Sequence, residues 1–415
     1  MNRKQLILLI VVGLVLGGLA LVFRNSRDQE FQRRDVGIGE KLLGDFPSQD
    51  VVEVTIKSRD GEVNLVKQDV WVVKERSSYP AAFAQISELV RKLWELKPAQ
   101  SQNVGQSQWG RLELLPPGTK DAGTNTATLV ELKAKDGKVV GAVLLGKKQM
   151  RESGGPGGGF PVGRWIALPG KTDTVFVASE TFNEIEPKPE AWLNKESFLK
   201  VEKLKSISLV STQATNSWSL SRTNETSDWT LADPREGEVL DKSKVSSLNW
   251  AFSSPSFTDV LPKDAETVKG SFTTPTIIKM DTFEGFSYEV SVGSPSDTEN
   301  FWIAVAASAE LPKERVVQAE EKAEDKEKNE KSWKEQQDKL KEKLKKEQAL
   351  AGWVYQVAKW TVDSVLKDRS ALLTDTKASG GDGAAGVGGL PPLPGAGAPT
   401  EVPPFLAPPD AGPEK

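Results

Sequence analysis

The strongest constraint on the fold is an internal repeat, because one order of predicted elements occurs twice along the chain. In the first copy, alternating apolar residues predict strands at 51–57 and 62–67, joined by a turn at Asp60-Gly61, and a third strand at 70–74. A helix and a longer hairpin follow. Repeated order of this kind predicts two copies of one supersecondary unit.

The helix of the first copy is expected to open at Tyr79-Pro80, with Pro80 in its first turn, because proline lacks the N–H that a first turn leaves unpaired. Apolar residues then recur at helical spacing. They predict one buried stripe made of Phe83, Ile86, Leu89, Val90, Leu93 and Leu96.

The remaining elements of the first copy are a hairpin over 127–146, which turns at Asp136-Gly137, and strands at 164–168 and 174–178. The second copy repeats the order with strands at 204–210, 217–221 and 228–231, a helix capped by Asp241, a hairpin over 276–293, and strands at 301–305 and 353–357. The expected fold class is therefore α+β, with two duplicated β-rich units.

Tryptophans recur at equivalent places in both copies, as Trp71 and Trp165 in the first and Trp229 and Trp302 in the second. Recurrence of this kind is what a core requires, and we favour it over a carbohydrate-stacking platform.

Several motifs of the first copy resemble the domain-of-unknown-function 4340 family, namely Trp71, Tyr79-Pro80-Ala81, Gly110-Arg111-Leu112, Gly146 and Trp165. Arg111 interrupts the usual Gly-Leu pair of the family. The resemblance covers residues 50–200 and, more weakly, a second copy to about residue 375. It implies a bacterial membrane-anchored protein, often encoded near auxiliary ABC-transporter components of the gliding-motility type, and it transfers no catalytic residue.

An unbroken apolar run from Leu6 to Phe23 predicts a membrane anchor, since a helix of this length spans roughly 27 Å. No Ala-x-Ala-like site follows the run, which favours an uncleaved anchor over a signal peptide. Gly13 and Gly17 form a small-xxx-small pair for close helix approach, although glycine is common in membrane helices generally. We expect a single-pass protein of the bacterial inner membrane with an extracytoplasmic body. The flanking Lys and Arg do not by themselves favour that orientation.

A charged insertion at 311–350 interrupts the second copy and predicts a solvated helical arm. Its apolar residues are chiefly Trp333, Leu340 and Leu344, too few for a heptad seam, and they are the candidate partner contacts. The expected organisation is an anchor at 1–30, repeat units at 45–200 and 201–376, and a disordered Gly/Pro/Ala tail at 377–415.

Composition narrows the chemistry, because the chain has no histidine and no cysteine. Ser-His-Asp, Cys-His and HExxH sites are therefore excluded, whereas carboxylate pairs, Ser-Lys dyads and Mg²⁺ or Ca²⁺ sites remain possible. No motif for a cofactor or metal stands out, so neither is expected. The net charge of −4 is too balanced for nucleic-acid binding. Residues 141–148 approach a phosphate-binding loop, but Lys148 stands where a hydroxyl must hold magnesium, so we reject it.

Three classes of function remain. The first is a membrane-tethered, non-catalytic assembly or accessory protein that binds other membrane or extracytoplasmic proteins, such as an auxiliary subunit of an ABC-transporter or gliding-motility-type complex. The second is a module that binds cell-wall glycan or peptide. The third and least favoured is a hydrolase that uses Ser or carboxylates, since Ser197-Lys200 and Ser364-Lys367 have the S-x-x-K spacing without a KTG partner.

Overall fold

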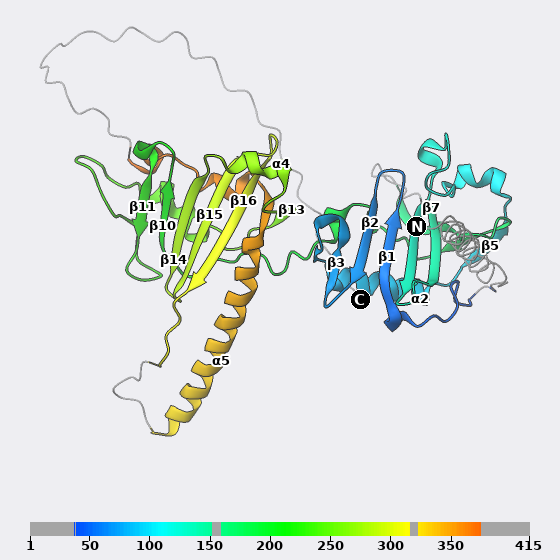
Figure 1. The fold of residues 1–415 in the computed structure, drawn as a ribbon, viewed down its shortest axis with the longest axis horizontal. Coiled ribbons are helices and arrows are strands. Elements are labelled where there is room, and N and C mark those ends of the chain that lie inside the picture. Colours follow the sequence, from blue (N-terminus) through cyan, green and yellow to red (C-terminus); the bar gives the residue numbers. More distant parts are fainter. Residues whose placement is uncertain (1–36, 38, 152–158, 316–322, 375–415) are drawn as a thin grey trace, which may run out of the picture. The chain divides into compact units, whose positions relative to one another are not determined.

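The computed structural model describes residues 37, 39–151, 159–315 and 323–374. These residues form an α+β structure with two antiparallel sheets and few helices, and both sheets belong to one unit that ends at Thr374 (Figure 1). The expected anchor at 6–23 and the expected tail at 377–415 lie outside the described residues. Within the described ranges, no helix is both long and apolar enough to cross a membrane.

The first sheet has the strand order β4-β3-β2-β1-β6-β7-β8-β9-β5, and helix α2 (Phe83–Glu95) lies between β4 and β5 in the chain. Its strands are β1 (Val51–Lys57), β2 (Glu62–Lys67), β3 (Trp71–Val73), β4 (Tyr79–Pro80), β5 (Gln100–Asn103), β6 (Thr128–Ala134), β7 (Val139–Arg151), β8 (Phe160–Ala167) and β9 (Thr174–Ala178).

The second sheet has the order β12-β11-β10-β14-β15-β16-β17-β13. Its strands are β10 (Leu204–Val210), β11 (Trp218–Ser221), β12 (Thr230–Leu231), β13 (Phe257–Pro262), β14 (Thr276–Thr282), β15 (Phe286–Pro295), β16 (Asn300–Ala309) and β17 (Trp353–Ala358). The α-helices of this part are α3 (Lys242–Val245), α4 (Glu266–Lys269), α5 (Ala323–Gln348) and α6 (Trp360–Asp363).

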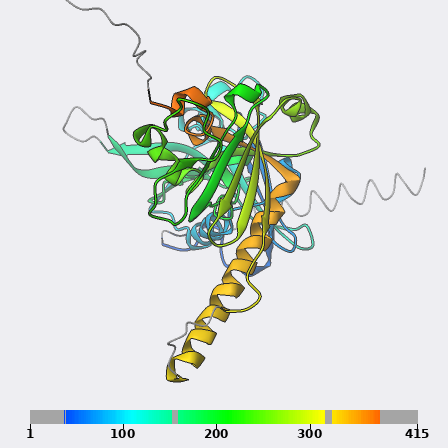
Figure 2. The same ribbon diagram turned by 90° about the vertical axis from the view of Figure 1, so that its left-hand side faces the viewer.

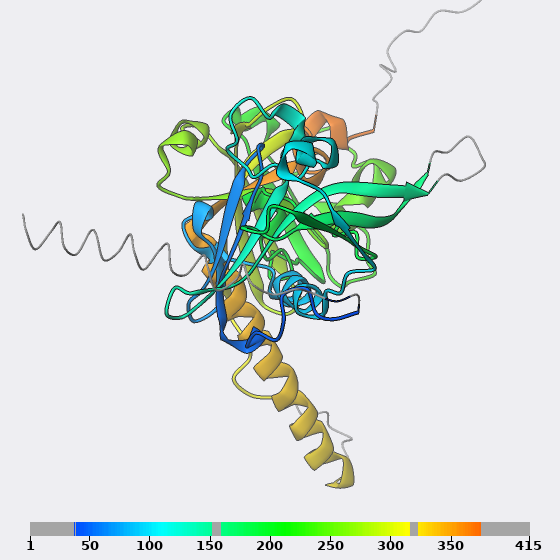
Figure 3. The ribbon, with the colours of Figure 1, turned by 90° about the vertical axis from the view of Figure 1, so that its right-hand side faces the viewer.

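The two sheets share one strand order, apart from the additional edge strand β4. In both, one edge strand, β5 or β13, precedes the central hairpin in the chain and pairs with the final strand, β9 or β17. Figures 2 and 3 show the second and the first sheet, respectively, toward the viewer. The order of elements read from the sequence therefore appears twice in space.

A glycine stands at the same place in each sheet, near the end of the pairing between the two central strands. A Cβ on Gly146 would lie 2.4 Å from the carbonyl oxygen of Leu112, and one on Gly293 would lie 2.8 Å from that of Ser271. A Cβ atom does not come this close to a carbonyl oxygen in real structures. Glycine is therefore required at both places for the segment that contains Leu112 or Ser271 to pack against the sheet.

The predicted start of the first helix is wrong. Tyr79-Pro80 forms edge strand β4, with Pro80 opposite Val72, and α2 begins only at Phe83. An edge strand tolerates proline because no further strand needs its N–H. The Phe83 side chain is 64% exposed, so it does not belong to the buried stripe, whereas the other predicted stripe residues are buried.

Edge strands β5 and β13 were not predicted from the sequence. All four residues of β5 are exposed and polar, so they show no apolar alternation. The hairpin turn at Asp136-Gly137 is confirmed, with Gly137 at a φ of +75°. The Asp241 cap is also confirmed, since its carboxylate accepts from the backbone N–H groups of Ser243 and Lys244.

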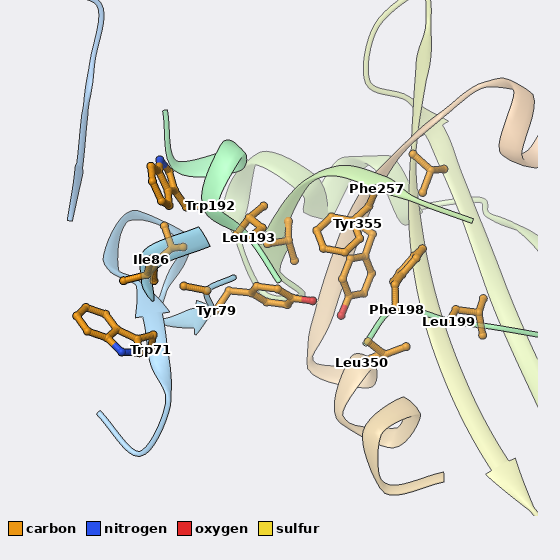
Figure 4. Close-up of a cluster of buried hydrophobic side chains, with 14 of the residues drawn as sticks. Trp71, Tyr79, Ile86, Trp192, Leu193, Phe198, Leu199, Phe257, Leu350 and Tyr355 are labelled. Carbon is orange, nitrogen blue, oxygen red and sulfur yellow. The ribbon is translucent and has the colours of Figure 1, made fainter. Parts of the chain in front are cut away.

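One continuous cluster of buried apolar residues extends over both sheets. Within it, the ring of Tyr79 lies edge-on to those of Phe257 and Tyr355, with centroid distances of 5.9 and 6.2 Å (Figure 4). The ring of Trp353 also lies edge-on to Tyr79, at 5.0 Å. Beside these rings, Arg76 donates to both carboxylate oxygens of Asp259, at 2.6 and 2.9 Å. The residues that follow β3 are thus tied to the second sheet.

Candidate interaction site: the charged helix α5 and its root

Helix α5 occupies most of the predicted insertion and connects the neighbouring strands β16 and β17. Its 26 residues contain no glycine or proline and are mostly Lys, Glu and Gln, which favour helix, and an i,i+4 pair joins Glu342 to Lys346 at 2.8 Å. At 1.5 Å per residue the helix is about 39 Å long. In the first sheet the corresponding connection, between β8 and β9, is only residues 168–173.

One stripe of α5 packs on the second sheet, and we call residues 337–348 the root. Leu340 and Leu344 lie one turn apart and contact the apolar core. Gln337 and Glu347 continue the same stripe and are buried, with 6% and 3% of their surface exposed. The sequence predicted a solvated arm, but one stripe of this half packs on the sheet, because two polar residues complete a stripe that the leucines alone are too few to form.

The carboxylate of Glu347 is the centre of a polar network at the root. It accepts hydrogen bonds from the Tyr288 hydroxyl at 2.8 Å and from the backbone N–H of Lys200 at 3.2 Å. The Lys343 ammonium lies 3.9 Å from Glu347 and 3.9 Å from Glu202, and 4.8 Å from the centre of the Phe286 ring. Three separate segments of the chain are thus tied together here.

Burial dominates the electrostatics of this network. It raises the pKa of the Glu347 carboxyl, because a desolvated carboxylate is costly, and the opposing attraction of Lys343 and the hydrogen bonds from Tyr288 and Lys200 are smaller effects. Burial, together with the charge of Glu347, also raises the pKa of the Tyr288 hydroxyl. The hydroxyl therefore remains a hydrogen-bond donor, and the pair fastens α5 to β15.

Among the described residues, the first sheet has no such network at the equivalent place. Gly141 faces Leu132 across β6 and β7 as Tyr288 faces Met280 across β14 and β15. A Cβ on Gly141 would lie 3.2 Å from Leu43, so an apolar side chain fills the space that Tyr288 and Glu347 occupy in the second sheet. The polar root is thus a feature of the sheet that carries α5.

The other half of α5, residues 325–336, differs from the root, and we call it the arm. Its side chains are exposed except for that of Trp333, which is half-buried and lies one turn beyond Gln337 on the stripe. Arg315, at the end of the described chain that leaves β16, forms an ion pair with Glu330 at 3.4 Å. The arm therefore presents charged side chains of both signs and the accessible part of one indole.

The predicted partner contacts separate into two groups. Leu340 and Leu344 are partly buried and pack against the core. Trp333 is also partly buried, but it lies on the arm and is not among the residues that pack against this core. The other predicted site residues, Leu6, Gly13, Gly17 and Phe23, lie outside the described part of the chain. The sequence reading missed Gln337 and Glu347. The 3–4 spacing of residues 333, 337, 340, 344 and 347 would have indicated them if polar side chains had been allowed in the stripe.

The structure shows where the first S-x-x-K pair and two of the recurring tryptophans lie. Ser197 and Lys200 lie in an irregular segment rather than on one helix face, and Lys200 pairs with Glu202 at 2.8 Å. This carboxylate raises the pKa of Lys200, whereas a lysine that acts as a base needs a lowered pKa. Trp71 and Trp229 are buried, so neither offers a ring face for stacking on a sugar.

Comparison with known proteins gives a single kind of match. The model of a family described as "Domain of unknown function (DUF4340)" matches residues 71–275, which include most of the first sheet and the start of the second. No curated protein and no solved structure matches the chain.

Proposed function

Since the chain belongs to the family of the domain of unknown function DUF4340, we propose that it acts as an assembly or accessory protein that holds a partner protein with the arm of α5. The apolar run at 6–23 is proposed to tether the body to a membrane, so that the arm meets partners near the bilayer.

The observation that carries this proposal is the unequal burial along α5. Its root is fixed by Leu340, Leu344 and the buried Glu347–Tyr288 pair, whereas the side chains of 325–336 are almost all exposed. A helix fixed at one end holds its other end in a defined position, which lowers the entropy cost of binding. Indoles are the side chains most often found at the energetic centre of protein interfaces, which favours Trp333 as the central contact.

Photo-crosslinking in cells tests this proposal. We expect a photoreactive residue in place of exposed Glu335 to give one discrete adduct of constant size. The same residue in place of Lys279, which is exposed on β14 of the second sheet, is the control and is expected to give none. Equal adduct patterns from both positions would argue against a binding arm.

Removal of the indole tests the contact itself once the adduct has been identified. We expect Trp333→Ala to weaken binding of that partner by about 2 kcal/mol, roughly 30-fold, because truncation of a central tryptophan has this effect. The measurement is titration calorimetry with full-length protein. Lys345→Ala, at an exposed position of the root, serves as the control. Unchanged affinity in a normally folded Trp333→Ala protein contradicts the assignment.

A further inference from the structure

A polar pocket opens at the end of the first sheet where β1 turns into β2. Its volume is about 410 Å³, within the roughly 300–1,000 Å³ that is usual for small-molecule sites. Three segments that are far apart in the sequence line this pocket. They are the turn at 58–60, the residues at 124–128 that lead into β6, and the segment at 186–188.

Two walls of the pocket are held together by contacts that need no ligand. A Cβ on Gly61 would lie 2.5 Å from the carbonyl oxygen of Pro187, so only glycine lets the turn after β1 approach this segment so closely. The carbonyl oxygen of Glu186 accepts a hydrogen bond from the indole N–H of buried Trp192 at 2.8 Å. These walls are therefore pre-formed, which lowers the entropy cost of binding.

Three threonines give the remaining wall a set of hydroxyl groups. Thr124, Thr126 and Thr128 all line the pocket, and backbone hydrogen bonds to Leu115 on both sides of Thr126 hold this wall in place. The Thr126 hydroxyl donates to the carbonyl oxygen of Gly123 at 3.4 Å and can still accept a hydrogen bond. The hydroxyls of Thr124 and Thr128 have no partner among the described residues. A ligand therefore meets groups that both donate and accept.

The charged side chains that line the pocket cancel in sum. Arg59 pairs with Asp60 at 2.8 Å. Lys188 and Glu186 form no ion pair with any described residue, so both charges are open to a ligand. Among the described lining residues, Pro187 alone is apolar and none is aromatic. An apolar ligand would remove water from these groups without replacing its hydrogen bonds, and an ion of either sign would meet a like charge.

We propose that this pocket binds a neutral saccharide. Sugar hydroxyl groups donate to the Glu186 carboxylate, accept from the Lys188 ammonium, and do both with the threonine hydroxyls. A zwitterionic amino acid would pair with the two open charges but would leave the threonine wall unused. Because hydrogen bonds rather than ring stacking carry the affinity, we expect weak binding. The inference goes beyond partner binding by the arm of α5 and does not depend on it.

Saturation-transfer NMR tests the proposal, because it detects weakly bound ligands. Full-length protein is prepared in phosphatidylcholine nanodiscs, since many detergents carry sugar headgroups. The probes are glucose, galactose and N-acetylglucosamine, with dialanine as a zwitterion. We expect transfer to at least one of the sugars and none to dialanine. Transfer to dialanine alone, or to no probe, would overturn the proposal.

Paired substitutions assign the signal to the pocket. We expect Glu186→Ala combined with Lys188→Ala to reduce the transfer to the bound sugar by about ten-fold, because hydrogen bonds to both charges are lost. Both side chains are exposed, so the variant should fold, which circular dichroism checks. Glu184→Ala combined with Lys97→Ala, at exposed positions outside the lining, is the control and should leave the transfer unchanged. A signal of native size in the pocket variant would show that the sugar binds elsewhere and contradict the assignment.

Discussion

Glu347 is the residue on which the attachment of α5 most directly depends, because it joins the helix to both β15 and the segment before β10. A buried carboxylate in this position is held at a cost, which its partners offset only in part. Gln337, on the same stripe, has a buried amide oxygen with no hydrogen-bond donor among the described residues. The root of α5 therefore combines apolar packing with two buried polar groups, the Gln337 amide and the Glu347 carboxyl, whose burial costs free energy.

Substitution of Glu347 by Gln is expected to change how stability depends on pH. The folded state raises the pKa of Glu347 above its ordinary value of 4.5, so the folded protein holds its proton more tightly than the unfolded chain. The resulting contribution to stability is fully present below pH 4.5 and is lost as pH rises through the folded-state pKa. Glu347→Gln removes the charge and keeps one acceptor oxygen for the N–H of Lys200, while its NH2 group can donate to the oxygen of the Tyr288 hydroxyl.

The free energy of unfolding of Glu347→Gln minus that of the native protein should therefore increase as pH rises from 4.5, by at most about 1.4 kcal/mol per pH unit. Urea denaturation at a series of pH values measures this difference. Glu335→Gln, at an exposed position of the same helix, is the control and should give a flat difference. A flat difference for Glu347→Gln as well would show that its carboxyl does not govern the root.

Among the strands and helices, the central hairpins were predicted from the sequence, whereas edge strands and the root of α5 were not. Central hairpins such as β6–β7 were predicted because one face of each strand is buried and the turn carries Asp136-Gly137. Edge strands such as β5 were missed because pairing through backbone groups alone leaves no side-chain pattern. The root was missed for a related reason, since Glu347 is buried through its hydrogen bonds rather than its hydrophobicity.

The two matched glycines give a prediction for the elements they join. Gly146→Ala and Gly293→Ala should each destabilise the protein by about 1–3 kcal/mol, because the new methyl group forces the carbonyl of Leu112 or Ser271 away from the sheet. Chemical denaturation provides the measurement. Gly105→Ala is the control, since its φ is −63° and no atom lies within 4 Å of the position that the new methyl group would take. If both alanine variants are as stable as the control, the segments around Leu112 and Ser271 can shift away from the sheet at little cost in free energy.

The whole described molecule is joined by the cluster around Tyr79, so we expect both sheets to unfold in one cooperative transition. Tyr79→Ala removes the ring that contacts Phe257, Trp353 and Tyr355, and should cost about 3 kcal/mol or more. We expect it also to divide the calorimetric transition into two, because the coupling between the sheets is weakened more than either core.

Trp109→Ala is the matched control for this experiment. Trp109 is 2% exposed and belongs to a smaller apolar cluster confined to the first sheet, together with Leu114 and Leu144. Its truncation should destabilise the protein without separating two transitions. If Tyr79→Ala unfolds in a single transition, the cluster is not what couples the sheets, and the Arg76–Asp259 pair becomes the next contact to test.

The shared strand order also bears on how the chain folds. While the sheets form, a central strand of one half can pair with strands of the other half, because the two sheets have the same strand order. Wrong pairing between repeats is a common source of slow refolding and aggregation. Divergence at equivalent positions opposes it. Tyr288 in place of Gly141 would collide with Leu43, and Gly141 in place of Tyr288 would leave Glu347 without its hydroxyl donor. We therefore expect the root that fastens α5 also to oppose the exchange of strands between the two halves during folding.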